Sequence, residues 1–331
     1  MENKSLLSIC IPTYNRASYL EQILDKMYDV CINNHIHIFI SDNASQDNTQ
    51  EVVDKYLKNS SLIHYFRQQS NIGPDDNFEY VLKMSTTKYR WLMSDTCYID
   101  ELDTLISDLE TNELDGCVLS APRLRSQYLP SEKICYNDSI SVMRDMGWHL
   151  SWISCMIYNE KIVNSMNFDR YRFSSFNQTA LMFETTAGRD CKILFHPRVI
   201  VKNVPSEVKD SAWHYHVFDV MYRQWYLMIM SLPLYYPYEI KKKCVEDNSR
   251  CSLVLRLYFQ AERRMDRKWS FKDVYRNRFF IKQAKGCYKT LLLLGICPPT
   301  ILKCLFYSIK ECGHLVNVFF RTVGIKTIAP Y

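Results

Sequence analysis

Two short apolar segments near the start of the chain each run into a group of polar residues. The segment 6–11 is followed by Pro12, Thr13, Tyr14, Asn15 and Arg16, and the segment 36–40 is followed by Ser41, Asp42 and Asn43. A tyrosine ring can stack on a planar base, a carboxylate can accept a hydrogen bond from a base N–H, and an arginine can contact a phosphate. These residue types, placed at two strand ends, indicate a ligand-binding site.

The surrounding sequence supplies the elements that would position these side chains. Apolar runs predict strands at 6–11, 36–40, 62–66 and 89–93, and helical spacing of apolar residues predicts helices at 18–33, 49–59 and 75–84. Alternating strands and helices predict a parallel sheet with right-handed crossovers. The carboxyl ends of the strands then share one edge, which is where ligands bind in open α/β sheets.

Two further strand ends bring polar groups to the same predicted edge. Asn71 and Gly73 form a turn after the third strand, either a plain structural turn or a place where glycine lets the backbone approach a ligand closely. Asp95 follows the fourth strand. We therefore expect Tyr14, Asp42 and Asp95 to meet along a single rim of the sheet.

The order and spacing of these motifs resemble the start of inverting family 2 glycosyltransferases with the GT-A fold. The resemblance covers residues 5–100 well and 150–200 loosely, and the subgroup that looks most similar attaches sugars to bacterial surface polysaccharides. It implies an α/β fold, with a Rossmann-like, mainly parallel sheet flanked by helices. It also implies transfer of a sugar, with inversion, from a nucleotide-sugar donor to a saccharide or lipid-linked saccharide acceptor.

The resemblance assigns donor contacts to the residues at the predicted rim. These are Pro12, Thr13, Tyr14, Arg16, Asp42, Asn43, Asn71, Gly73 and Asp95. Structural alternatives exist, because a tyrosine after a proline is often a packed loop aromatic and Ser-Asp-Asn is a good turn in any protein. Arg16 could likewise pack on the helix that follows it.

The predicted metal site departs from the family pattern. The family carries Asp-x-Asp after the fourth strand, whereas this chain has Asp95 followed two residues later by Cys97, a poor ligand for Mg²⁺ or Mn²⁺. Three alternatives follow: Asp95 alone holds the cation with donor oxygens and water, Asp100 substitutes for the missing acid, or the chain works weakly or without metal. We favour the first alternative.

The catalytic base is the second departure. Family members carry acids at the start of a helix in the second half of the sheet, where this chain has the amides Asn177 and Gln178, which cannot accept the proton. Glu184, about two turns further along that helix, and Asp169, just before it, are the replacements that we expect.

Histidines provide further candidates for chemistry. His149 is another candidate base, and His196, His214 and His216 are candidate metal ligands, since a late histidine binds metal in some enzymes with this fold. Aromatic-rich segments like the one around 213–216 more often form an acceptor wall or a core.

Beyond residue 95 the pattern is less regular. It predicts a helix at 99–109, a strand at 116–120, a loop at 124–138, a helix beginning in 174–183, a strand at 192–201, and helices at 217–229, 239–264 and 270–286. We therefore divide the chain into a catalytic domain at 1–210 and a mostly helical region at 211–331.

Composition and cysteine usage limit the class of protein. The 331 residues are 47% hydrophobic, and the 13 cysteines are scattered without a Cys-x-x-Cys pair, which indicates a globular chain with reduced core cysteines. The start of the sequence has neither the apolar region of a signal peptide nor the length of a membrane span. We expect a cytoplasmic protein.

Charge is divided unevenly along the chain. Residues 241–331 hold 19 lysines and arginines against 6 acids, whereas residues 1–240 hold 22 against 30. A basic carboxyl-terminal region, with apolar residues at helical spacing in 300–320, predicts peripheral contact with the inner face of the cell membrane; packing on the catalytic domain is the alternative. The double proline at 298–299 argues against a spanning helix.

Two other functions deserve comparison. Cys97 and the amides Asn177 and Gln178 are compatible with a transferase-like scaffold that has lost its chemistry and serves a polysaccharide assembly complex. Nucleic-acid binding is disfavoured, because the basic residues are interleaved with long apolar stretches rather than organised into a reading module.

Overall fold

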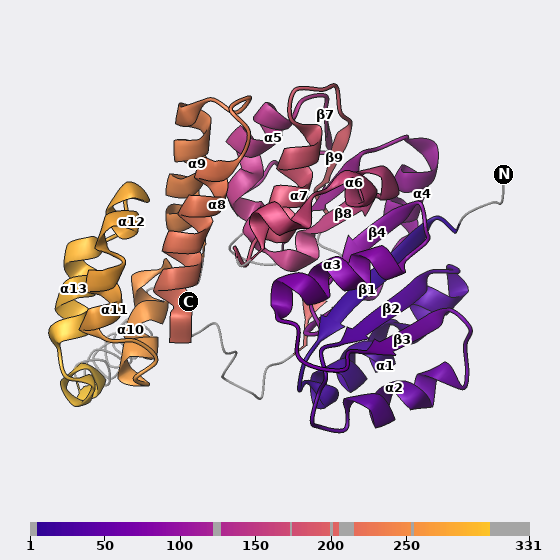
Figure 1. Cartoon of the computed structure of the whole chain (residues 1–331), viewed down its shortest axis with the longest axis horizontal. Coiled ribbons are helices and arrows are strands. Elements are labelled where there is room, and N and C mark those ends of the chain that lie inside the picture. Colours follow the sequence, from indigo (N-terminus) through magenta and orange to yellow (C-terminus); the bar gives the residue numbers. More distant parts are fainter. Residues whose placement is uncertain are drawn as a thin grey trace, which may run out of the picture.

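A computed structural model describes residues 5–121, 127–172, 174–198, 201–204, 215–252 and 255–304. The predicted amino-terminal strands are present as β1 (Leu7–Thr13), β2 (His37–Asp42), β3 (Ile63–Arg67) and β4 (Tyr89–Leu92). They are joined by helices α1 (Ala17–Asn33), α2 (Thr49–Leu57) and α3 (Pro74–Met84). The four strands are parallel in the order β3-β2-β1-β4, so their carboxyl ends share one edge, as Figure 1 shows.

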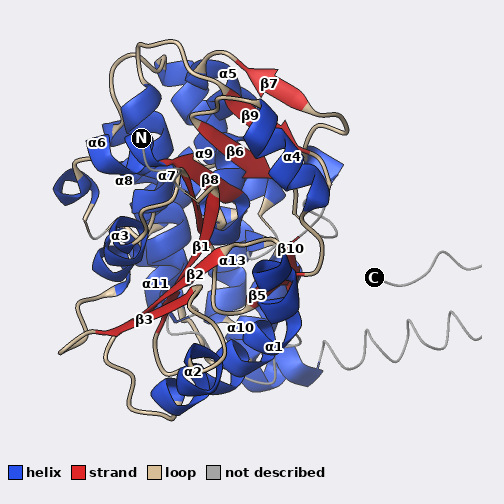
Figure 2. Cartoon of the chain, turned by 90° about the vertical axis from the view of Figure 1, so that its right-hand side faces the viewer, coloured by secondary structure: helices blue, strands red, loops and turns tan. Residues whose placement is uncertain are grey.

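Strands β1, β2 and β4 are buried on both faces, which explains their nearly continuous apolar runs, whereas the edge strand β3 is partly exposed. Ile9 and Ile11 of β1 pack with α1, whereas Cys10 packs on the α3 side with Leu82. This alternation follows from the two-residue period of a strand. Figure 2 shows α1 and α3 on opposite sides of the sheet.

The second half of the sheet is mixed rather than parallel. Strand β8 (Met156–Asn159) lies antiparallel between β4 and β6 (Gly116–Leu119), followed by β9 (Ile193–His196) and the edge strand β7 (Ile134–Tyr136). A separate pair consists of β5 (Cys97–Ile99) and β10 (Val201–Asn203). The mainly parallel α/β sheet that we predicted is confirmed, with the antiparallel strands β8 and β7 as additions.

Three predicted elements need correction. The predicted loop 124–138 contains β7, whose hydrogen bonds come from distant β9, so no local pattern marks it. The predicted strand 192–201 is two strands, β9 and β10, which belong to different sheets. The predicted helix 99–109 begins later, as α4 (Asp103–Thr111), because Cys97–Ile99 pairs with β10.

The remaining helices of the sheet region flank its second half. They are α5 (Ser139–Met146), α6 (Glu160–Ser165) and α7 (Asn177–Thr186), with short 3-10 turns at Gly147–Ser151, Ile153–Cys155 and Phe168–Tyr171. The N-terminus of α5 is capped by Asp138, whose carboxylate accepts from Ser141 N at 2.7 Å.

The carboxyl-terminal described region is helical, as predicted. It contains a π-helical turn at Asp219–Gln224, then α8 (Trp225–Ser231), α9 (Tyr238–Cys251), α10 (Leu257–Met265), α11 (Phe271–Arg276), α12 (Arg278–Gln283) and α13 (Tyr288–Ile296). The predicted helices 239–264 and 270–286 are each divided in two. Helix α9 packs on α5, whereas α10–α13 form the far end of the molecule (Figure 1).

Helices α11 and α13 approach each other closely at Gly295. A Cβ there would lie 2.9 Å from the Cα of Phe271, so a larger residue would push the two helices apart. None of the helices in the described residues has the length and hydropathy required to cross a bilayer. The predicted helical spacing in 305–320 and the boundary at 210 fall outside the described residues.

Candidate functional site

Hydrogen bonds join the loops that follow β1 and β2. Asn43 N donates to Thr13 O at 2.9 Å, Asn15 N donates to Ser45 Oγ at 2.9 Å, and Gln46 N donates to Asn15 Oδ1 at 2.7 Å. Asn15 has a φ of +52°, a left-handed conformation that asparagine tolerates better than most residues. The loops are therefore fixed before any ligand arrives, and they leave the intervening Tyr14 side chain 42% exposed.

The carboxylate of Asp42 is buried at the end of β2. Its Oδ1 accepts from Ser45 N at 2.8 Å, and its Oδ2 accepts from Tyr65 Oη at 2.7 Å, with Arg67 Nε at 3.7 Å. Burial and the bond to Asp42 raise the pKa of Tyr65, so the phenol keeps the proton that it donates. Tyr65 and Arg67 were not among the predicted site residues, although Arg67 stands opposite Asp42 in the strand register.

Asn43 connects the β2 loop to the turn after β3. Its Nδ2 donates to Asn71 Oδ1 at 3.0 Å and to Gly73 O at 3.2 Å, and its Oδ1 accepts from Ile72 N at 2.8 Å. Gly73 has a φ of +88°, which favours glycine, and no atom lies within 4 Å of where its Cβ would be. The structure thus brings Asn43, Asn71 and Gly73 together.

Asp95 lies at the end of β4, against the end of β1. Thr13 Oγ1 donates to Asp95 Oδ2 at 3.0 Å, and the side chain of Asp95 is 9% exposed. Burial raises the pKa of Asp95, while the charge of Arg16 and the bond from Thr13 oppose this rise. Asp42 and Asp95 therefore flank the joined β1 and β2 loops from which Tyr14 projects, and all three belong to one edge of the sheet.

The neighbours of Asp95 do not complete an Asp-x-Asp site. Cys97 is buried in β5, its Sγ donates to Asn203 Oδ1 at 3.1 Å, and burial raises its pKa to about 11, so it remains a thiol near neutral pH. Asp100 forms an ion pair with Lys202. In the described part of the chain, no three His, Cys, Asp or Glu side chains are grouped so that they could hold a metal ion.

The two carboxylates predicted as catalytic base lie among cations. Glu184 accepts from Arg170 Nη1 at 2.7 Å and from Tyr171 Oη, far along α7 from Asn177. Asp169 is exposed and pairs with Arg172. The structure does not bring either one into contact with Asp95 or Asp42 through any hydrogen bond between described residues.

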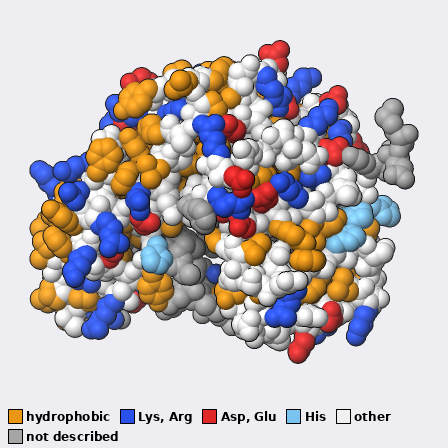
Figure 3. Space-filling view, in the orientation of Figure 1, with side chains coloured by type: hydrophobic (Ala, Val, Ile, Leu, Met, Phe, Trp, Pro, Cys, Tyr) orange, Lys and Arg blue, Asp and Glu red, His pale blue; other side chains and the backbone are white. Residues whose placement is uncertain are grey.

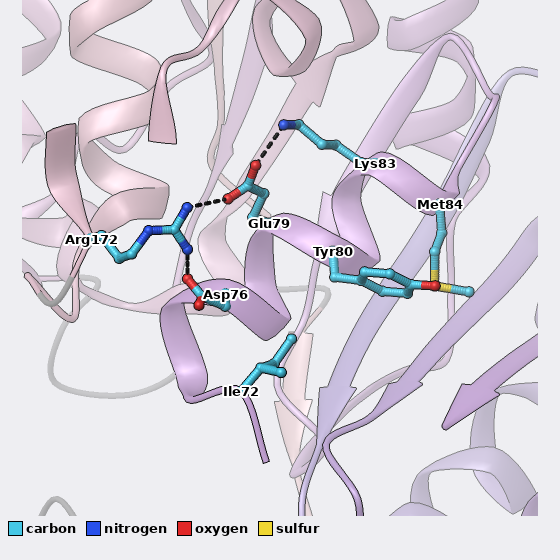
Figure 4. A pocket seen from close by; sticks show the side chains of 7 residues that line it. All are labelled: Ile72, Asp76, Glu79, Tyr80, Lys83, Met84 and Arg172. Atoms are coloured by element: carbon cyan, nitrogen blue, oxygen red, sulfur yellow. Dashed lines mark hydrogen bonds and ion pairs between the residues drawn. The ribbon is translucent and has the colours of Figure 1, made fainter. Parts of the chain in front are cut away.

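A shallow pocket of about 540 Å³ adjoins the turn after β3 (Figure 4). Its lining residues are Ile72, Asp76, Glu79, Tyr80, Lys83, Met84 and Arg172. Arg172 lies between Asp76 and Glu79, and Lys83 Nζ contacts Glu79 at 2.5 Å. These charges neutralise one another, so the pocket carries little charge of its own.

The histidines that we named as candidate base or metal ligands differ in their burial. His149 is fully buried, with Nε2 2.9 Å from Leu119 O. His196 is also buried, which lowers its pKa against the opposing effect of Asp108, and its Nε2 lies 3.3 Å from Thr104 Oγ1. His216 is exposed, and His214 falls outside the described residues. His149 and His196 thus occupy core positions.

Comparison with known proteins identifies the family. The model described as "Glycosyl transferase family 2" matches residues 8–165. The abequosyltransferase RfbV of Salmonella typhimurium is 28% identical over 218 residues, which is 59% of this chain and 66% of that protein. A Campylobacter jejuni GalNAc(5)-diNAcBac-PP-undecaprenol beta-1,3-glucosyltransferase is 28% identical over 102 residues, 30% of this chain and 31% of that protein. Each match spans less than two thirds of the relative's own length.

Solved structures agree on the fold. S. aureus TarS 1–349 in complex with UDP-GlcNAc has a TM-score of 0.55 and 13% identity, covering 87% of this chain and 90% of that one. Mannosyltransferase PcManGT from Pyrobaculum calidifontis, in complex with GDP-Man and Mn²⁺, has a TM-score of 0.53 and 15% identity, covering 93% and 81%. The resemblance that the strand-end motifs indicated is thereby confirmed: residues 8–165 match glycosyl transferase family 2, and the chain has a GT-A fold.

Proposed function

We propose that this chain is an inverting glycosyltransferase of surface polysaccharide biosynthesis. It moves a sugar from a nucleotide-sugar donor to a saccharide or lipid-linked saccharide acceptor. The observation that carries the proposal is the edge formed by β1, β2 and β4, where an exposed Tyr14 lies between the buried carboxylates of Asp42 and Asp95. Abequosyl and glucosyl transfer by the two named relatives support the class of reaction.

The donor is held by residues that the loops already fix in place. Tyr14 stacks on the base, Asp42 accepts from it, and the turn formed by Asn43, Asn71 and Gly73 lies beside the ribose and diphosphate. Pro12 and Thr13 shape the same loop. Arg16 packs over the ring of Tyr19 in α1, as its packing alternative predicted, and its charge acts on Asp95 from there, so it adds positive charge on the side where the phosphates would lie. Preorganised loops reduce the ordering cost of binding.

A divalent cation, Mg²⁺ or Mn²⁺, fits the single carboxylate that β4 offers. Asp95 is mostly buried and its pKa is raised, so a cation beside it would offset the cost of burying its charge. The bound ion would neutralise the departing diphosphate. With Cys97 committed to Asn203, donor oxygens and water would supply the other ligands.

Titration calorimetry with UDP-, GDP-, CDP- and dTDP-sugars, with and without Mn²⁺, tests the proposal. We expect one nucleotide to bind with micromolar affinity and Mn²⁺ to tighten it, and nucleoside diphosphate to be released on incubation. Failure of all donors and all free nucleoside diphosphates to bind would contradict it.

A transferase-like scaffold is the second candidate function. The hydrogen bond between Cys97 and Asn203, together with the amides at the start of α7, favours it. Measurable turnover that disappears in Asp95→Ala would exclude this alternative.

We further propose that the α11–α13 surface, defined here as residues 271–303, contacts the anionic lipids at the inner face of the cell membrane. Exposed cations and exposed apolar side chains alternate over it: Lys272, Arg276, Arg278, Lys282, Lys289 and Lys303, with Phe279, Leu293, Ile296 and Ile301. Figure 3 shows this mixture at the end of the molecule that carries α13.

One stripe of α13 illustrates the arrangement. Lys289, Leu293 and Ile296 recur at helical spacing on one face, and the side chain of Leu293 is 68% exposed. Between residues 256 and 303 the chain has twelve lysines and arginines against three acids. Cations attract anionic headgroups while apolar side chains enter the interface, which is how peripheral helices bind membranes.

A further inference from the structure

The start of α7 is tied to the loops of the proposed donor site from two sides. On one side, Asp75 Oδ2 accepts from Ser175 N at 3.1 Å, and Asn177 Nδ2 donates to Asp75 O at 2.8 Å. Asp75 is buried in the first turn of α3, two residues after Gly73, so these bonds join the start of α3 to the start of α7.

On the other side, α7 is tied to the end of β4. Thr179 Oγ1 donates to Leu150 O at 2.7 Å. Four residues later in that segment, Ser154 Oγ accepts from Ser94 N at 3.0 Å, next to Asp95. The first turn of α7 is thus bound both to the first turn of α3 and to the segment that supports Asp95.

Two buried oxygens in this first turn accept no hydrogen bond from any described residue. They are Asn177 Oδ1 and Gln178 Oε1, on side chains that are each 2% exposed. A buried acceptor without a partner destabilises the folded state. Hydroxyl groups of a bound ligand are donors that would satisfy such oxygens.

We propose that Asp75, Asn177 and Gln178 form the acceptor-hydroxyl site and that Asp75 is the catalytic base; this rests on the proposed function. The amide oxygens accept hydrogen bonds from acceptor hydroxyls. Asp75 takes the proton of the attacking hydroxyl, whose oxygen forms the new bond to the anomeric carbon. The bond from that carbon to the diphosphate breaks, and its electron pair leaves with the nucleoside diphosphate.

The other carboxylates around α7 are less suited to this role. Glu184 lies two turns away and is held by Arg170 and Tyr171. Asp76, adjacent to Asp75 in sequence, faces the pocket of Figure 4 and pairs with Arg172. Asp76 therefore provides a matched control for Asp75.

The test compares Asp75→Asn with Asp76→Asn, using the donor sugar that binds the wild type and water as acceptor. We expect Asp75→Asn to slow nucleoside diphosphate release about 10²- to 10⁴-fold, the usual contribution of a general base, and Asp76→Asn to change it less than threefold. Affinity of both variants for nucleoside diphosphate with Mn²⁺ should stay within threefold of the wild type. Release that survives in Asp75→Asn, or falls equally in Asp76→Asn, would overturn the inference.

If Asp75→Asn does not fold, the single variant Asn177→Asp still tests the proposal, because it leaves the carboxylate of Asp75 in place. Asn177→Asp adds a carboxylate beside Asp75, and because like charges raise each other's pKa, the acid limb of the kcat profile should move to higher pH. In the double variant Asp75→Asn/Asn177→Asp, the displaced carboxylate should restore part of the rate. An unshifted profile together with no restoration would count against Asp75. No release by the wild type with any donor would instead remove the proposed function itself.

Discussion

The sheet edge and the α11–α13 surface use polar side chains in opposite ways. At the edge, Asp42 accepts two hydrogen bonds, and Asp95 accepts one from Thr13, so charged groups are buried and directed by neighbours. On the α11–α13 surface, Lys282 and Lys289 are exposed on short helices, and Lys282 also lies over the ring of Tyr288. A fixed arrangement suits one small ligand whose reacting atom must be placed accurately. A diffuse arrangement suits an extended anionic surface, where each charge contributes without a defined partner.

The largest expected effect tests the fixed arrangement. Asp95→Ala should lower kcat/KM for donor turnover about 10²- to 10³-fold, because a directed charge that acts on the leaving group is lost. Asp100→Asn is the matched control, since Asp100 pairs with Lys202 instead. Nucleoside diphosphate release measures both. A comparable loss in Asp100→Asn would indicate that Asp100 carries the metal role.

The next effect tests the diffuse arrangement. Lys282→Ser/Lys289→Ser should weaken binding to vesicles containing phosphatidylglycerol about thirtyfold, because each cation near the surface contributes about 1 kcal/mol. Co-sedimentation at two salt concentrations measures it. Vesicles of phosphatidylcholine alone should bind poorly from the start.

An apolar substitution separates insertion from simple attraction. Leu293→Ser on α13 should reduce vesicle binding, whereas Leu234→Ser should not, although the Leu234 side chain is 99% exposed, since it lies on the connection between α8 and α9. Equal losses of vesicle binding in the two variants would indicate nonspecific hydrophobic adsorption rather than binding through a defined surface. Retention of a labelled DNA duplex by the same cations would favour the nucleic-acid alternative.

A smaller effect concerns the support of Asp42. Tyr65→Phe removes the hydroxyl that donates to Asp42 Oδ2 and should lower the free energy of unfolding by about 1 kcal/mol. Urea denaturation measures this loss, with Tyr80→Phe, on the neighbouring pocket wall, as control. If nucleotide affinity stays unchanged as well, Asp42 does not depend on the Tyr65 hydroxyl for its position.

The elements that local pattern determines were predictable, and those that depend on distant pairing were not. Apolar runs and helical spacing predicted β1 to β4 and α1 to α3 within a few residues. Strand β8 lies antiparallel between β4 and β6. This strand order depends on tertiary contacts, which cannot be predicted from the local periodicity of apolar residues.

The site shows the same division. Thr13 and Asp95 were predicted at a shared edge because each follows a strand, and the structure places them in hydrogen-bonding contact. Tyr65 was overlooked because it lies within a strand, where an aromatic residue is expected for packing. Asp75 was overlooked because its importance arises from α7, which begins 102 residues later at Asn177. The catalytic roles of Glu184 and Asp169 stay predictions, and the proposal for Asp75 competes with them.

The smallest expected effect links the burial of Asp95 to stability. Its folded-state pKa is raised, so above that pKa the folded protein carries the cost of a buried charge, and below the unfolded pKa both states are protonated and the cost vanishes. Asp95→Asn keeps an acceptor for Thr13 and removes the charge. It should therefore be slightly more stable than the wild type at pH 7, with a difference that shrinks as pH falls through the folded pKa. Thermal unfolding of both proteins, measured from about pH 3.5 to about pH 7 so that the titration of the carboxyl group is included, tests this expectation. A less stable Asp95→Asn at pH 7 would mean that Arg16 outweighs burial and that the edge, even without ligand, is already balanced in charge.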